Sequence, residues 1–222
     1  MKSIFITVIS ILMASTLSSQ TNTLPVKEWS SSSQNPLVLY ISGDGGFNNF
    51  STELCTAISK RGYSVTAISA KSYFWDKKTP EQTAKDITAY LDKQFVNRKN
   101  QQLIFAGYSF GADVAPFIIT KLPDSVRKKL VSVVLLSPSE STDFEIHWFD
   151  IFGGNKKRSM DVVTELNKLD PIKTVTIFGN DENDFPFKSI KLKNYSNKIL
   201  PGGHHFDDNT DEVAATMVKY FN

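Results

Sequence analysis

A serine between two glycines stands where an apolar run meets a helical pattern. The motif is Gly107-Tyr108-Ser109-Phe110-Gly111, which follows a predicted strand over 102–107 and precedes a predicted helix over 112–122. A serine on a sharp turn from strand to helix has a strained backbone, and glycine at the two flanking positions avoids clashes. The helix N-terminus behind it favours developing negative charge. The motif predicts Ser109 as a nucleophile; the alternative is a structural turn without a catalytic role.

A serine nucleophile needs a base to take its proton and a carboxylate to orient that base. In folds that use this motif, the order along the chain is serine, acid, histidine. The chain has three histidines, and two of them, His204 and His205, follow the last short predicted strand. We favour His205 as the base and keep His204 as the alternative. His147 lies among apolar residues, and we interpret it as structural or pocket-lining.

The acid is expected in the loop Asn180–Asp184, directly after a predicted strand that ends at Gly179. The loop offers three carboxylates where one is required. Glu182 stands three residues beyond Gly179, the offset expected for the acid, so it is our first choice. Asp184 is the second choice and Asp181 the third. At least some of these carboxylates belong to an ordinary solvated loop.

An oxyanion formed by attack on a carbonyl needs backbone N–H donors. Phe110 supplies one by position, because it directly follows the nucleophile. The second is expected from the turn Gly43–Gly46, with Asp44 and Gly45 as the candidates. A phosphate-binding loop is the rival interpretation of this turn, but no Gly-Lys-Ser/Thr follows it.

No metal and no cofactor are expected. His204, His205, Asp207 and Asp208 could ligate a cation as a cluster, but the helix dipole adequately explains an acidic start to the last helix. Cys55 is the single cysteine, so no intrachain disulfide can form. We interpret it as a small buried hydrophobe rather than a reactive thiol.

The elements that must position these residues alternate along the chain. The predicted strands cover residues 37–42, 63–69, 102–107, 131–137 and 175–179, with a weak one at 198–200. The predicted helices cover 49–61, 112–122 and 212–221, with another opened by Thr79 and Pro80. Strands without polar alternation, separated by helices, imply a mostly parallel central sheet with helices on both faces. Such sheets bind ligands at the carboxyl ends of their strands, where every candidate segment lies. The pattern predicts the α/β-hydrolase fold.

The N-terminus has the parts of a secretory signal peptide over residues 1–19: a positive start at Met1-Lys2, an apolar run over Ile4–Met13 and small residues after it. The run is shorter than the ~20 residues that span a bilayer; the alternative is a buried N-terminal helix. Ser, Thr, Asn and Gln dominate residues 20–35, which predicts a flexible leader. Residues 36–222 are expected to form a single domain.

Charge excludes one class of partner. Lys plus Arg total 25 and Asp plus Glu total 23. Nucleic-acid binding normally needs a basic face, so no nucleic acid is expected. Contact with a membrane surface needs only a local patch and stays open.

Several longer motifs give a more specific resemblance. They are Ser42-Gly43-Asp44-Gly45-Gly46, Ser72-Tyr73-Phe74-Trp75 with Thr79-Pro80-Glu81-Gln82, Gly107 to Val114 with Pro116-Phe117, Phe144-Glu145-Ile146, and Leu200-Pro201-Gly202-Gly203-His204-His205-Phe206-Asp207. Through them the chain resembles the bacterial virulence protein VirJ / AcvB family of periplasmic α/β-hydrolases, over most of residues 37–220. AcvB-type members carry additional sequence, whereas this chain has room for one hydrolase unit.

The resemblance implies a periplasmic location, a substrate and partners. Members of the family are associated with hydrolysis of lysyl-phosphatidylglycerol, an aminoacylated membrane lipid, and VirJ-type members with type IV secretion and virulence. Ser109 would then attack the aminoacyl ester, with His205 as base and then acid. A cationic lysyl group would favour nearby carboxylates, for which the candidates are Asp113, Asp44 and Glu145. Tyr73, Phe74 and Trp75 would rest against lipid or simply pack behind a strand.

Two other functions stay open from the sequence. The first is an esterase or thioesterase that acts on other substrates with the same catalytic residues. The second is a hydrolase-fold protein without activity, which binds components of a secretion or envelope complex. An intact nucleophile, base and acid argue against the second.

Overall fold

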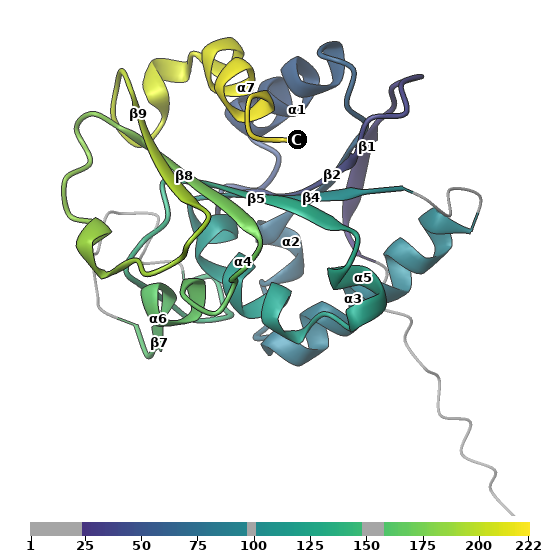
Figure 1. Cartoon of the computed structure of the whole chain (residues 1–222), viewed down its shortest axis with the longest axis horizontal. Coiled ribbons are helices and arrows are strands. Elements are labelled where there is room, and N and C mark those ends of the chain that lie inside the picture. The colour runs from purple at the N-terminus through teal and green to yellow at the C-terminus, as the bar shows by residue number, and fades with distance from the viewer. Residues whose placement is uncertain (1–23, 97–100, 148–157) are drawn as a thin grey trace, which may run out of the picture.

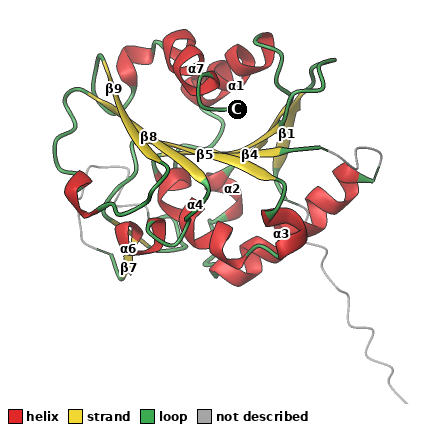
Figure 2. Cartoon of the chain, in the orientation of Figure 1, coloured by secondary structure: helices red, strands yellow, loops and turns green. Residues whose placement is uncertain are grey.

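A seven-stranded sheet forms the centre of the molecule, in the strand order β1-β3-β2-β4-β5-β8-β9. The computed structural model describes residues 24–96, 101–147 and 158–222, so the predicted signal peptide lies outside the described residues. All neighbouring strands of this sheet are parallel except β1 and β3. Helices cover both faces (Figure 2). The predicted α/β architecture is therefore confirmed.

The strands of the main sheet are short, and all are largely buried except the edge strands β1 and β9. They are β1 Val26–Trp29, β2 Leu37–Ile41, β3 Val65–Ile68, β4 Leu103–Tyr108, β5 Leu130–Leu136, β8 Lys173–Gly179 and β9 Tyr195–Leu200. A separate two-stranded sheet pairs β6 Ser141–Thr142 with β7 Met160–Asp161. Every residue of β2, β3 and β4 is buried, as expected for parallel strands covered on both faces.

Two groups of helices sandwich the sheet (Figure 1). One face carries α1 Asn49–Lys60 and α7 Thr210–Val218. The other carries α2 Ala70–Tyr73, α3 Pro80–Phe95, α4 Phe110–Lys121, α5 Asp124–Arg127 and α6 Val162–Leu166. Two short 3-10 helices lie in loops: η2 Phe187–Ser189 between β8 and β9, and η3 Phe206–Asp208 between β9 and α7. Each face has its own hydrophobic cluster.

Local sequence explains where the longer helices begin. The Thr79 hydroxyl accepts a hydrogen bond from the Gln82 N–H, and the Gln82 side chain accepts one from the Thr79 N–H. This capping box, with Pro80 at the first helical position, satisfies amides that have no intrahelical acceptor. Asn48 caps α1 in a similar way through the Ser51 N–H. Cys55 is fully buried in α1, as predicted.

The predicted flexible leader is wrong over Val26–Trp29. Val26–Trp29 pairs antiparallel with Val65–Ile68 as β1, and the Trp29 indole N–H donates a hydrogen bond to the Thr56 hydroxyl over 3.0 Å. The strand is only four residues long and stands beside a serine-rich stretch, so composition hid it. Its antiparallel pairing closes one edge of the sheet.

None of the helices within the three described ranges combines the length and hydropathy needed to cross a bilayer.

Candidate active site

Ser109 lies on the turn between β4 and α4 in a strained conformation, with φ 52° and ψ −122°. The flanking glycines have a steric reason. A Cβ at Gly107 would lie 2.4 Å from the carbonyl oxygen of Gly111, and a Cβ at Gly111 would lie 2.2 Å from that of Ile41. Both distances are far below van der Waals contact, so only glycine fits. The predicted strand–serine–helix turn is present.

Two hydrogen bonds connect Ser109 to a histidine and then to a carboxylate. Nε2 of His204 lies 2.8 Å from Oγ of Ser109, and Nδ1 of His204 lies 2.7 Å from Oε1 of Glu182. An ionised carboxylate only accepts hydrogen bonds, so Nδ1 carries the proton. Nε2 of the neutral ring is then free to accept the proton of the serine hydroxyl.

The structure corrects the choice between the two histidines. The Nδ1 of His205, the predicted base, lies 2.7 Å from the Tyr108 hydroxyl, and its ring lies edge-on to Phe50 at 6.3 Å. The ring of His204, the alternative, faces Ser109 instead. Phe206 fixes the direction of the loop because it is buried in the core. The aromatic neighbour of His205 thus reflects packing and does not mark the base.

Glu182, the acid favoured in the predicted loop, accepts hydrogen bonds from three donors. Beside His204, its Oε2 accepts hydrogen bonds from the Gly179 N–H over 2.8 Å and from the Ser137 hydroxyl over 2.6 Å. Burial by itself raises the pKa of Glu182, but these hydrogen bonds outweigh burial and hold that pKa below its usual value. The other two candidates, Asp181 and Asp184, are exposed.

The surroundings of His204 favour its protonated form. Burial alone would lower the pKa of the ring, but the hydrogen bond and charge of Glu182 raise it, with smaller contributions from Asp113 and Asp44. The pKa of His204 therefore lies above its usual value. A ring that gains basicity from its carboxylate is suited to take a proton from a neighbouring hydroxyl.

Backbone amides next to Ser109 form a candidate oxyanion site. Phe110 is the first residue of α4, so its N–H has no intrahelical acceptor. The turn Gly43–Gly46 is closed by the Gly46 N–H, which donates to the Gly43 carbonyl over 2.9 Å. This turn lies against the nucleophile, because a Cβ at Gly43 would be 3.4 Å from Cβ of Ser109. Asp44 and Gly45, the predicted donors, occupy the middle of the turn.

The predicted substrate contacts have different positions. Asp113 is buried, its Oδ1 accepts a hydrogen bond from the Ser139 N–H over 2.5 Å, and burial raises its pKa to about 7. Asp44 and Glu145 are half-buried. The prediction that Tyr73 binds substrate is wrong: the side chain is buried, and its hydroxyl donates to Asp86 over 2.6 Å.

Phe74 and His147, two other residues singled out in the sequence, also make packing and structural contacts. Phe74 is buried and its ring packs against Phe110 with centroids 5.1 Å apart, which leaves only Trp75 of the three aromatic residues exposed. His147 pairs with Asp143 over 2.8 Å, consistent with a structural histidine.

Sequence reasoning missed two residues that support the site. Ser137 follows β5 at the same edge of the sheet as the other site residues, and its position after a strand was the available signal. Tyr108, the residue before the nucleophile, donates a hydrogen bond to the carbonyl of His204 over 3.1 Å. Nothing in the sequence marks this contact.

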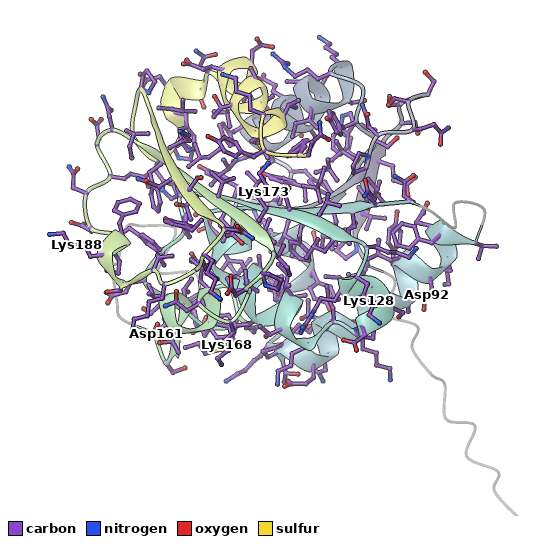
Figure 3. All side chains as sticks on the ribbon, in the orientation of Figure 1. Asp92, Lys128, Asp161, Lys168, Lys173 and Lys188 are labelled. Atoms are coloured by element: carbon purple, nitrogen blue, oxygen red, sulfur yellow. The ribbon has the colours of Figure 1, made fainter. Side chains whose placement is uncertain are left out.

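A cavity of about 490 Å³ lies elsewhere, at the edge where β5, β8 and β9 begin. Its cationic lining includes Lys128, Lys168 and Lys173, which Figure 3 labels. The side chains that line it include no serine, cysteine or histidine. Ser109, Glu182 and His204 follow the carboxyl ends of β4, β8 and β9, at the opposite edge of the sheet.

Three solved structures have a similar fold. MenH from S. aureus superimposes with a TM-score of 0.61 at 14% identity, over 88% of this chain and 97% of that chain. The esterase EaEST from Exiguobacterium antarcticum gives 0.62 at 13% identity, over 88% and 94%. Est1E from Butyrivibrio proteoclasticus, with ferulic acid bound, gives 0.60 at 15%, over 90% and 97%. The protein has the α/β-hydrolase fold.

The family is more specific than the fold. The sequence model described as bacterial virulence protein (VirJ) matches residues 35–222, and the chain belongs to this family. None of the curated proteins compared with the chain matches it.

Proposed function

We propose that the protein is a serine hydrolase in which Ser109 is the nucleophile, His204 the general base and acid, and Glu182 the orienting carboxylate. One observation carries this proposal: the unbroken chain of hydrogen bonds from Oγ of Ser109 through both nitrogens of His204 to Glu182, at 2.8 and 2.7 Å. A serine with a purely structural role in the turn would not need a histidine and a carboxylate bonded to it in series.

The mechanism follows from the positions of the donors and acceptors. His204 takes the hydroxyl proton at Nε2 while Oγ of Ser109 bonds to the ester carbonyl carbon. The negative oxygen of the tetrahedral intermediate lies against the amide of Phe110 and an amide of the Gly43–Gly46 turn, from Asp44 or Gly45. His204 then gives its proton to the leaving alcohol. Water, activated by the same ring, releases the acid from the serine.

The substrate we propose is the aminoacyl ester of lysyl-phosphatidylglycerol, as the family resemblance implies. Any aminoacyl ester carries an ammonium group on the carbon next to the scissile carbonyl. The charges of Glu182, Asp113 and Asp44 all act on His204, so a cation beside the reacting carbon meets a negative environment. Asp44 is the best placed to bind it, because it is half-buried and lies in the turn beside Ser109.

Location and partners belong to the same proposal. Export through the predicted signal peptide to the periplasm would bring the enzyme to the membrane surface that presents this lipid. Glu145 is a second candidate for the side-chain ammonium of the lysyl group, and components of a secretion system are candidate partners.

The experiment is lysine release from vesicles of lysyl-phosphatidylglycerol by protein that lacks residues 1–19, beside a Ser109→Ala control. We expect release from the unmodified protein and at least ~10³-fold less from the variant, because the variant keeps only binding and oxyanion stabilisation. Equal release from both would contradict Ser109 as nucleophile.

A second candidate function is an esterase or thioesterase on other substrates. The observation that favours it is that EaEST, an esterase, shares the fold over most of both chains. Turnover of p-nitrophenyl acetate with no lysine release from vesicles would select this alternative. Failure of a fluorophosphonate to label Ser109 would select the binding protein without activity.

A further inference from the structure

The loop after β5 contacts both the acid of the site and the helix of the nucleophile. Ser137 begins this loop, and its hydroxyl donates a hydrogen bond to Oε2 of Glu182 over 2.6 Å. Two residues further on, the Ser139 N–H donates to Oδ1 of Asp113 over 2.5 Å. Asp113 lies in the first turn of α4, which begins directly after Ser109. The loop therefore bridges the nucleophile helix and the carboxylate behind His204.

The conformation of Ser137 is unusual and firmly held. Its φ is 48°, in the left-handed region that residues other than glycine rarely adopt. The side chain is buried, and its N–H continues the sheet by donating to the Ile177 carbonyl over 2.8 Å. A strained residue persists only when its surroundings fix it, and such residues cluster at functional sites.

The direction of the Ser137 hydroxyl decides which oxygen of Glu182 is available. Oε2 accepts from both Ser137 and the Gly179 N–H, which leaves Oε1 for Nδ1 of His204. Two donors on one oxygen fix the plane of the carboxylate, and the ring of His204 is oriented by the other oxygen. Hydrogen bonds to an ionised group are about twice as strong as those between neutral groups.

The partner of Ser139 has a matching role. Asp113 is a buried carboxyl group whose oxygen is occupied by a backbone amide of the loop. This contact ties the loop to the first turn of α4, and a movement of one would move the other.

We propose that Ser137 is a positioning residue that orients Glu182 toward His204, and that Asp113 holds the Ser137–Ser139 loop in place through the Ser139 amide. The proposal deepens, and rests on, the proposed serine hydrolase function. Ser137 follows β5, which lies between β4, the strand before the nucleophile, and β8, the strand before the acid. Its hydroxyl therefore gives Glu182 a second hydrogen-bond donor beside the Gly179 amide.

The test compares two hydroxyl-to-carboxylate hydrogen bonds of equal length. Ser137→Ala removes the one at the site, and Thr120→Val removes the bond from Thr120 to Oε1 of Glu165, also 2.6 Å, at the far end of α4. On a soluble ester, we expect Ser137→Ala to lower kcat about 10-fold and Thr120→Val to leave it unchanged. In a Glu182→Ala background, Ser137→Ala should change kcat less than about twofold, because its partner is gone.

A second readout needs no substrate. The charged groups that act on His204 are Glu182, Asp113 and Asp44, and Ser137→Ala leaves all three in place. The hydrogen bond and charge of Glu182 raise the pKa of His204, and a carboxylate that is no longer oriented by Ser137 stabilises the protonated ring less. NMR titration should therefore show the pKa of His204 moving downward in Ser137→Ala and staying in place in Thr120→Val.

Asp113 is tested by its conservative replacement. Asp113→Asn keeps an oxygen that accepts from the Ser139 N–H, whereas Asp113→Ala leaves that amide without an acceptor. We expect Asp113→Ala to lower kcat about as much as Ser137→Ala, and Asp113→Asn to restore most of it. Equal losses in both variants would overturn the role of the Asp113 contact.

The positioning role of Ser137 is overturned if its replacement lowers kcat equally with and without Glu182 and leaves the His204 titration unmoved. Failure of the proposed function is a separate result. It would appear as hydrolysis that does not depend on Ser109, while the titration of His204 still reports the hydrogen bond.

Discussion

Two adjacent histidines at one end of β9 have different partners. The ring of His204 lies between a serine and a carboxylate, whereas that of His205 is exposed and bonds to the Tyr108 hydroxyl. Tyr108 also donates to the backbone of His204. His205 therefore contacts the site through Tyr108, through the loop, and through its ring, which lies edge-on to that of His204 with centroids 5.7 Å apart.

Replacement of each histidine separates the two roles. We expect His204→Ala to lower kcat about 10⁴-fold, because the nucleophile loses its base. His205→Ala should keep kcat within about tenfold of the unmodified protein, since it removes one supporting hydrogen bond. Initial rates on a soluble ester measure both. Comparable losses in the two variants would contradict the assignment of His204.

At the scale of single residues, the sequence predicts residue types and spacing better than the direction in which a side chain points. The offset of Glu182 from Gly179 selected the carboxylate that bonds to His204, because the end of a strand and the first turn of its loop leave little freedom. The choice between His204 and His205 depends on the rotation of a loop whose direction is set by the burial of Phe206. Such a tertiary contact leaves no local pattern.

The elements of the site meet through close backbone contact. A Cβ at Gly179, the last residue of β8, would lie 2.3 Å from the carbonyl oxygen of Gly203. The absence of a side chain therefore lets the acid-bearing loop touch the loop that carries His204. The distance between acid and base depends on this contact.

Gly179→Ala should separate the two loops. We expect a loss of at least about 2 kcal/mol in the free energy of unfolding, as for overpacking in a core, and a fall in kcat beyond what stability explains. Urea denaturation and rates at low temperature measure the two effects. Gly203→Ala is the matched control, because the nearest atom to its Cβ would be 3.7 Å away. A Gly179→Ala protein with unchanged activity would refute the contact's role.

Apart from β1, the strands of the main sheet and the long helices were predictable, and the short helices were not. The predicted strand over 131–137 appears as Leu130–Leu136, and the predicted helix over 112–122 as Phe110–Lys121. The helices α2, α5 and α6 have four or five residues each, which is too few for an apolar period to show. Their positions follow from packing on the sheet.

At the scale of the whole molecule, the residues before β2 complete the sheet. β1 covers the outer edge of β3 by antiparallel pairing, and Trp29 anchors it to α1 through Thr56. Without β1, the backbone of β3 would present unpaired N–H and C=O groups, which promote association with other chains. The family match begins at residue 35, so this strand lies outside the matched region.

Two truncated proteins test whether β1 belongs to the domain. A protein that begins at residue 36 lacks β1, and one that begins at residue 24 keeps it. We expect the shorter protein to lose at least about 2 kcal/mol of stability, since it loses buried apolar area and the strand's hydrogen bonds. For a chain of this size, that loss lowers Tm by about 4–8 °C. Thermal unfolding and light scattering measure stability and association.

Because β1 lies at the far edge of the sheet from β8 and β9, Ser109-dependent turnover at low temperature should survive the deletion. An unchanged Tm would mean that the strand is dispensable, and that the domain begins where composition predicts.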